Sequence, residues 1–154
     1  LEQLIESVQS ENIKAFLDLP LEGSKVVVGD GPQREELQKA YPEVVFTGAR
    51  QGEELAAHYA SGDVFVFPSR TDTFGLVMLE AMARGLPVAA YPVPGPLDIF
   101  DGVGVGALNE NLSLAVGEAI KLPREACRAH ALKYSWTACA EMFLENLSPL
   151  QRPQ

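Results

Sequence analysis

Short apolar runs alternate with helical patterns along most of the chain. The predicted strands are the runs at 25–29, 44–48, 64–67 and 87–91, with a further short strand at 103–105. Polar residues are scarce in these runs, which is typical of strands that helices cover on both faces. The pattern therefore predicts an α/β fold, Rossmann-like, with a doubly wound and mainly parallel sheet.

The segments between these runs have helical spacing. Helices are predicted at 32–40, 53–60, 75–84, 111–120, 124–132 and 136–147. The three prolines of 92–96 predict a stiff loop instead. Residues 1–8 have the spacing of an amphipathic helix. Without a strand there, the strands at 26–28 and 64–67 would pair directly, or another chain would fill the gap between them.

Length and charge narrow the class of protein. The 154 residues predict one domain over 1–147, with 148–154 as a tail. A net charge of −9 argues against broad binding to nucleic acid or to an anionic membrane. With two histidines and two cysteines, the spacing predicts no metal site. No apolar run is long enough for a transmembrane segment, and no basic signal region opens the chain, so we expect a cytoplasmic location. The chain does not begin with Met, so we expect a piece of a longer protein.

Ligands of an open α/β sheet bind outside the carboxyl ends of its strands. Gly29, Asp30, Gly31 and Pro32 follow the first predicted strand, and the two glycines allow a close approach of a ligand to the backbone. Arg34 stands where a dinucleotide-binding fingerprint would need its third glycine. By itself, this loop is better explained by an ordinary tight turn.

The run from 68 to 88 carries more information. Asp72 precedes a predicted helix, and Glu80 lies eight residues later, so both can face the same side. Backbone amides at 73–76 would lie at the N-terminus of that helix, which suits a diphosphate without a lysine. Taken singly, Asp72 is better explained as a helix cap, and Glu80 as a solvated or buried residue of an amphipathic helix.

The whole run resembles the donor-site signature of retaining glycosyltransferases with the GT-B fold, in the large group 1 family. That family includes mannosyl-, glucosyl- and sulfoquinovosyltransferases, and its signature has two glutamates separated by seven residues. Here Asp72 stands in place of the first glutamate. Further matching motifs lie in order at 28–32, 45–48, 60–69 and 134–136. The resemblance spans roughly residues 12–147.

The resemblance implies a C-terminal, donor-binding domain whose ligand is a UDP- or GDP-linked sugar, with no separate cofactor. Glu80 would bind the ribose, and Asp72 would contact the hydroxyls of the transferred sugar; these two are the candidate catalytic residues. The other implied donor contacts are Thr73, Phe74, Gly75 and Leu76 at the diphosphate or sugar, Gly48, Ala49 and Arg50 near the base, and Gly29, Asp30, Gly31 and Pro32 along the cleft.

The N-terminus departs from the family pattern. Members commonly carry an arginine and a lysine that neutralise the diphosphate, and Glu6 and Glu11 stand at those positions. Two functions therefore stay open. The chain is either the donor domain of a hexosyltransferase, inactive without an N-terminal acceptor domain in cis or in trans, or a non-catalytic interaction domain of the same fold that no longer binds donor. A third and weaker alternative for the function is a nucleotide-sugar epimerase of similar fold, because epimerases lack the pattern found here at 68–88. Whether the chain forms a homodimer is also left open. A full-length form could also be peripheral to a membrane.

Overall fold

The computed structural model describes residues 2–6, 10–71, 75–100, 102–134 and 137. Its strands are β1 (Glu2–Glu6), β2 (Ser24–Val28), β3 (Val45–Gly48), β4 (Val64–Phe67), β5 (Val88–Ala90) and β6 (Gly106–Leu108). Its helices are α1 (Ser10–Leu17), α2 (Arg34–Ala40), α3 (Gly52–Ser61), α4 (Leu76–Ala83), α5 (Pro94–Phe100), α6 (Leu112–Ala119) and α7 (Arg124–Ala131).

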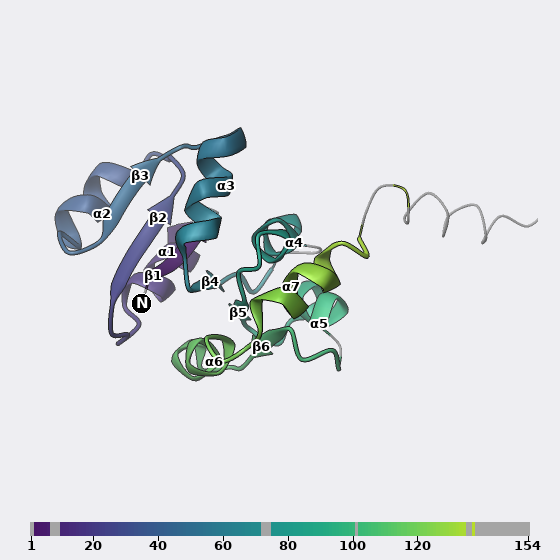
Figure 1. The fold of residues 1–154 in the computed structure, drawn as a ribbon. Coiled ribbons are helices and arrows are strands. Elements are labelled where there is room, and N and C mark those ends of the chain that lie inside the picture. The colour runs from purple at the N-terminus through teal and green to yellow at the C-terminus, as the bar shows by residue number, and fades with distance from the viewer. Residues whose placement is uncertain (1, 7–9, 72–74, 101, 135–136, 138–154) are drawn as a thin grey trace, which may run out of the picture.

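The strands form one sheet in the order β3-β2-β1-β4-β5-β6. Every strand is parallel to its neighbours, and helices lie on both sides of the sheet (Figure 1). This is the strand order of the doubly wound dinucleotide-binding fold, in which ligands bind where the order reverses. The reversal falls between β1 and β4, because the chain winds outward from β1 to β3 and then returns to place β4 on the other side of β1.

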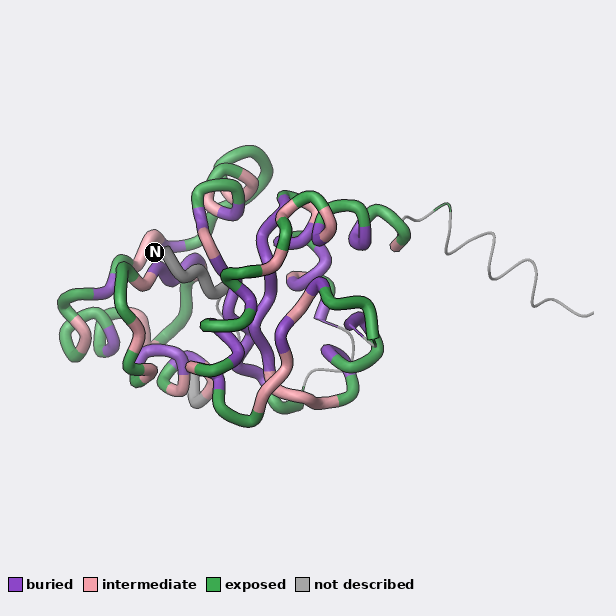
Figure 2. Tube along the Cα trace, turned by 60° about the horizontal axis from the view of Figure 1, so that its bottom comes forward, coloured by how far each residue is buried: buried purple, intermediate pink, exposed green. Residues whose placement is uncertain are grey.

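Alternation along the strands divides the apolar side chains between two cores. Phe65 and Phe67 of β4 pack with side chains of α3, α4, α5 and α7, whereas Val64 and Val66 pack with side chains of α1, α2 and α6. Successive side chains of a strand point to opposite faces, so one apolar run can supply both cores. Figure 2 shows the result as a buried band through the middle of the molecule, with helices that are exposed on their outer sides.

The main disagreement with the sequence-based expectation is at the N-terminus. Residues 2–6 form a strand, β1, rather than a helix, and β1 pairs with both β2 and β4. The gap expected between β2 and β4 therefore does not exist, and the prediction that they pair directly or through another chain is wrong. Eight residues are too short a window to separate the two periodicities, and pairing on both sides satisfies the backbone polar groups of β1.

Two further expectations need correction. The proline-rich segment continues into a helix, α5, because Pro94 lies at the first helical position, where its missing N–H costs nothing. The last strand covers 106–108 rather than 103–105. Gly102 and Gly104 have φ of +66° and +64°, so the chain turns there before it pairs with β5. The other predicted strands and helices are confirmed with shifts of at most two residues at their ends, except the helix at 136–147, which, like the tail, lies outside the described residues.

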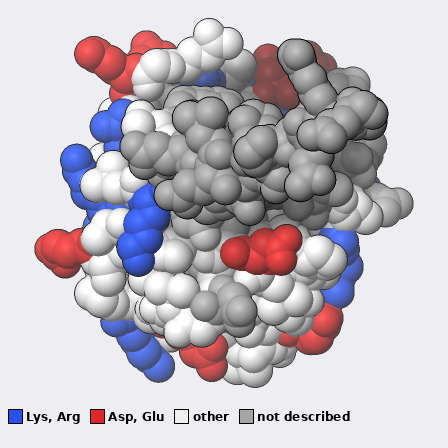
Figure 3. Space-filling view, turned by 90° about the vertical axis from the view of Figure 1, so that its right-hand side faces the viewer, with Lys and Arg blue, Asp and Glu red and all other residues white. Residues whose placement is uncertain are grey.

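The surface carries both acidic and basic side chains, as expected for a chain with a net charge of −9. On the face drawn in Figure 3, basic side chains gather toward one side but are separated by uncharged surface, and acidic side chains lie around them. Within the described part of the chain, no helix is long and apolar enough to cross a membrane.

Candidate functional site

The carboxyl ends of the parallel strands meet at one edge of the sheet, and two of the predicted loops touch there. The N–H of Gly29, after β2, donates to the carbonyl of Gly48 at the end of β3, at 3.0 Å. Asp30 accepts a hydrogen bond from the N–H of Gly31 at 2.8 Å, which fixes the turn. The structure thus joins the first of the predicted cleft residues, Gly29, to the first of the predicted base-contacting residues, Gly48.

The positively charged side chain of Arg34, on α2, lies between these two loops. Its guanidinium is 3.5 Å from the carboxylate of Asp30. Gly48 has a φ of +79°, and a Cβ atom there would lie 3.0 Å from Arg34 Nη1. Gly48 therefore serves two purposes, because it allows the left-handed turn and the close approach of the guanidinium. Arg50 extends outward and pairs with Glu54 at 3.7 Å on the surface of α3.

The N-terminus of α4 supplies the next predicted group. Gly75 caps α4 in the left-handed conformation, with φ +64°, and a side chain there would collide with the methyl group of Met78. Leu76, in contrast, is 59% exposed at the start of the helix. The other predicted residues of this segment, Asp72, Thr73 and Phe74, lie outside the described residues.

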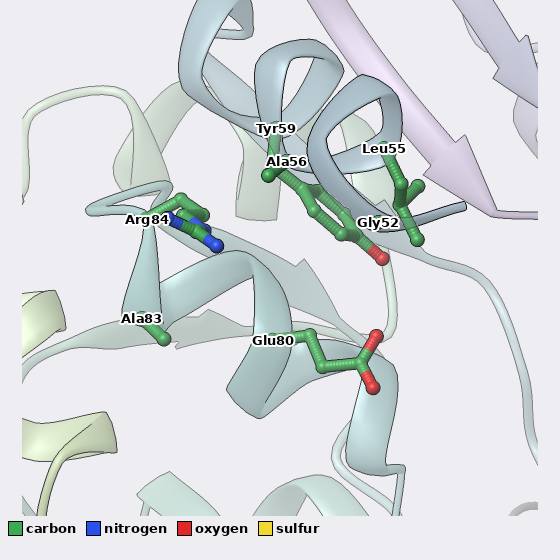
Figure 4. A pocket seen from close by; sticks show the side chains of 7 residues that line it. All are labelled: Gly52, Leu55, Ala56, Tyr59, Glu80, Ala83 and Arg84. Atoms are coloured by element: carbon green, nitrogen blue, oxygen red, sulfur yellow. The ribbon is translucent and has the colours of Figure 1, made fainter. Parts of the chain in front are cut away.

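Glu80 lines a pocket between α3 and α4 (Figure 4). The pocket has a volume of about 220 Å³ and is lined by Gly52, Leu55, Ala56, Tyr59, Glu80, Ala83 and Arg84. Gly52, which lines the pocket, begins α3 two residues after Arg50, the last of the predicted base-contacting residues. Drug-sized ligands occupy pockets of about 300–1,000 Å³, so this pocket is large enough for only part of such a ligand.

A third polar cluster joins the loops after β4, β5 and β6. Arg70 lies over the ring of Tyr91, 3.7 Å from the ring centroid, and donates to the carboxylate of Glu110 at 2.9 Å. The hydrogen bond from Arg70 to Glu110 raises the pKa of the guanidinium above its usual value. Sequence reasoning missed this cluster, because Glu110 is 40 residues away from Arg70 and no local spacing connects them.

Sequence reasoning also missed Tyr59. This residue falls on the apolar side of α3, where the pattern indicates a core residue, and it is indeed 2% exposed. Its membership of the pocket follows only from how α3 and α4 pack. In the part of the chain that the structure describes, no three histidine, cysteine, aspartate or glutamate side chains come together as metal ligands.

Comparison with known proteins points to one family. The family model described as "Glycosyl transferases group 1" matches residues 4–122. A sulfoquinovosyl transferase of Arabidopsis thaliana is 50% identical over 92 residues, which cover 58% of this chain and 18% of that protein. A GDP-mannose-dependent alpha-mannosyltransferase of Mycobacterium tuberculosis (strain CDC 1551 / Oshkosh) is 50% identical over 93 residues, which cover 60% of this chain and 23% of that protein. The matches therefore cover about a fifth of the length of these relatives.

Solved structures share the fold. The lipopolysaccharide outer core galactosyltransferase WaaB, in its apo form, superimposes with a TM-score of 0.74 at 15% identity, over 94% of this chain and 48% of that one. Anabaena HepE in complex with UDP-glucose superimposes with a TM-score of 0.69 at 21% identity, over 94% of this chain and 47% of that one. These likenesses confirm the expected Rossmann-like fold of the GT-B type.

Proposed function

The chain belongs to the family of glycosyl transferases group 1, and from this premise we propose that it is the nucleotide-sugar-binding domain of a retaining glycosyltransferase. The donor's ribose would bind at Glu80, and its base would lie near Gly48, Ala49 and Arg50. The diphosphate would meet the N-terminus of α4, beginning at Gly75 and Leu76. The reaction would transfer a hexose, with the acceptor bound by a separate domain in cis or in trans.

One observation carries this proposal. Glu80 and the first residue of α3, Gly52, line the same pocket (Figure 4), and Gly52 follows the expected base-contacting residues 48–50 closely in the sequence. A carboxylate accepts hydrogen bonds from both hydroxyls of a ribose, as the acidic residue of dinucleotide-binding folds does. The α4 N-terminus adds the positive end of a helix dipole for the diphosphate. The site thus presents complementary groups to the sugar and to the phosphates of one ligand.

The relatives supply the choice of donor to test. HepE was solved with UDP-glucose, and the mycobacterial relative is named for GDP-mannose. The two donors share a ribose diphosphate and differ in base and sugar. We therefore expect the ribose and the diphosphate, which both donors share, to bind at Glu80 and the N-terminus of α4. Contacts of residues 48–50 with the base would then determine whether the chain prefers UDP or GDP.

Isothermal titration calorimetry of the chain with UDP and with GDP tests the proposal. We expect micromolar binding of one of the two, and a Glu80→Gln variant to bind about tenfold to a hundredfold more weakly, because hydrogen bonds to a charged acceptor contribute about 1.5–3 kcal/mol. Glu118→Gln is the matched control, since Glu118 is exposed on α6, on the other side of the sheet. Absence of binding to both nucleotides, or equal losses in the two variants, would contradict the proposal.

A second candidate function rests on the charges of the N-terminus. β1 ends at Glu6, and Glu11 lies in the first turn of α1, where the family pattern has an arginine and a lysine. A chain that lost these cations would keep the fold and act as a non-catalytic interaction domain. The same calorimetry with a Glu11→Lys variant separates the two: UDP or GDP binding that appears only in the variant would favour the interaction domain.

A further inference from the structure

Tyr59 and Glu80 come from different helices and meet in the same pocket. Tyr59 lies on α3 and Glu80 lies on α4, and both line the space between the two helices. In Figure 4 the hydroxyl of Tyr59 and the carboxylate of Glu80 point toward one another. A phenol has one O–H to donate, and an ionised carboxylate can only accept, so the two groups are complementary.

The packing of Tyr59 fixes where its hydroxyl lies. The side chain is 2% exposed, and its ring meets the ring of Phe65 on β4 edge to face, with centroids 5.7 Å apart and an angle of 71° between the planes. Leu55, one turn earlier on α3, packs against the same core. A tyrosine held in this way has a hydroxyl whose position is set by the sheet and the core rather than by solvent.

Glu80 is exposed on α4. A glutamate side chain has several rotamers, and fixing one of them costs conformational entropy. A carboxylate that must accept two hydroxyls of one ribose needs to be oriented before the ligand arrives, since otherwise part of the binding free energy is lost in ordering it.

We propose that Tyr59 is a positioning residue for Glu80: its buried ring places the hydroxyl where it orients the Glu80 carboxylate toward the ribose hydroxyls of the donor. The inference rests on the proposed function, because it takes Glu80 as the ribose ligand. It extends that function by assigning a role to a residue outside the donor-site run at 68–88.

The test is a Tyr59→Phe variant, which keeps the ring and its contact with Phe65 and removes only the hydroxyl. Calorimetry would compare the nucleoside diphosphate that the unmodified chain binds, UDP or GDP, with its 2′,3′-dideoxy form, which lacks both ribose hydroxyls. We expect the variant to bind the ribose form about threefold to tenfold more weakly. Binding of the dideoxy form should stay unchanged, because Glu80 then has no hydroxyls to accept.

Tyr41→Phe is the matched control. The Tyr41 hydroxyl donates to the carboxylate of Asp18 at 2.6 Å, and Tyr41 does not line the pocket. The Tyr41→Phe variant should therefore bind both nucleotides with unchanged affinity. An equal loss for the two nucleotides in Tyr59→Phe, or no loss for either, overturns the positioning role while leaving the proposed function standing. If the unmodified chain binds neither UDP nor GDP, both the proposed function and this inference fall.

Discussion

Gly106 offers a quantitative test of the core, because a single methyl group added there has nowhere to go. A Cβ atom at this position would lie 2.5, 2.6 and 2.7 Å from Cδ1, Cε1 and Cγ of Phe100. Carbon atoms in contact are normally about 3.5–4.0 Å apart, so the ring would have to retreat by about 1 Å. Phe100 is 5% exposed and packs within the core, which has little room to yield.

We therefore expect Gly106→Ala to lower the free energy of unfolding by about 1–3 kcal/mol, the usual effect of overpacking. At about 2–4 °C per kcal/mol for a domain of this size, the melting temperature should fall by roughly 2–12 °C. Thermal and urea unfolding followed by circular dichroism would measure both quantities. The backbone at Gly106 is not in the left-handed region, so the loss reports on packing rather than on strain.

Gly117→Ala is the control for the same substitution. Gly117 is exposed within α6, and a Cβ atom there has no neighbour within 4 Å. Alanine is the better helix former by about 0.8–1.0 kcal/mol, so this variant should be more stable than the unmodified chain. The two substitutions are thus expected to change stability in opposite directions. A Gly106→Ala protein as stable as the unmodified chain would refute the packing of α5 against β6 described above.

Three further predictions concern single side chains. Arg124→Ala should lower the free energy of unfolding, measured in urea, by about 1–3 kcal/mol, because Arg124 of α7 donates to two carbonyls at the end of α3, at 2.8 and 3.1 Å. The hydrogen bond to Asp18 raises the pKa of Tyr41, so this bond stabilises the fold below about pH 10 and stops doing so as the pH rises through the raised pKa. The unmodified chain should therefore exceed the Tyr41→Phe variant in free energy of unfolding by less above pH 10 than below it. A difference that does not change with pH would contradict this prediction. Burial raises the pKa of the Cys127 thiol. In a Cys139→Ser variant, in which Cys127 is the remaining cysteine, the folded chain should therefore react slowly with a thiol reagent at neutral pH. Rapid reaction would contradict this prediction.

The parts of the fold that were predicted from the sequence are those in which one strand or helix carries its own signal. The run at 64–67 is apolar on both faces because β4 lies between two cores, and such a run can only be a central strand or a buried helix. Its length and the flanking glycine and proline decide for a strand. The same reasoning succeeds for 25–28 and for 88–90.

The parts that were not predicted depend on partners that are distant in the sequence. β1 is a strand because it pairs with β2 on one side and β4 on the other, and the local pattern of residues 2–6 does not indicate that these partners exist. The same limit applies to the site. Glu80 was found from a local motif, whereas the place of Tyr59 in the pocket depends on how α3 lies against α4.

The strand order shows that the position of the negative charges matters more for the proposed function than their number. A net charge of −9 spread over the surface acts weakly on a bound diphosphate, since charges separated by more than about 10 Å are largely screened at 0.1 M salt. A charge at the end of β1 would act more strongly, because the order of the strands reverses beside β1. In doubly wound folds the ligand crevice lies at such a reversal, outside the carboxyl ends of the strands. Glu6 ends β1. Under the proposed function, donor binding would depend less on the net charge of the chain than on whether Arg34 and the N-terminus of α4 offset the negative charges of Glu6 and Glu11.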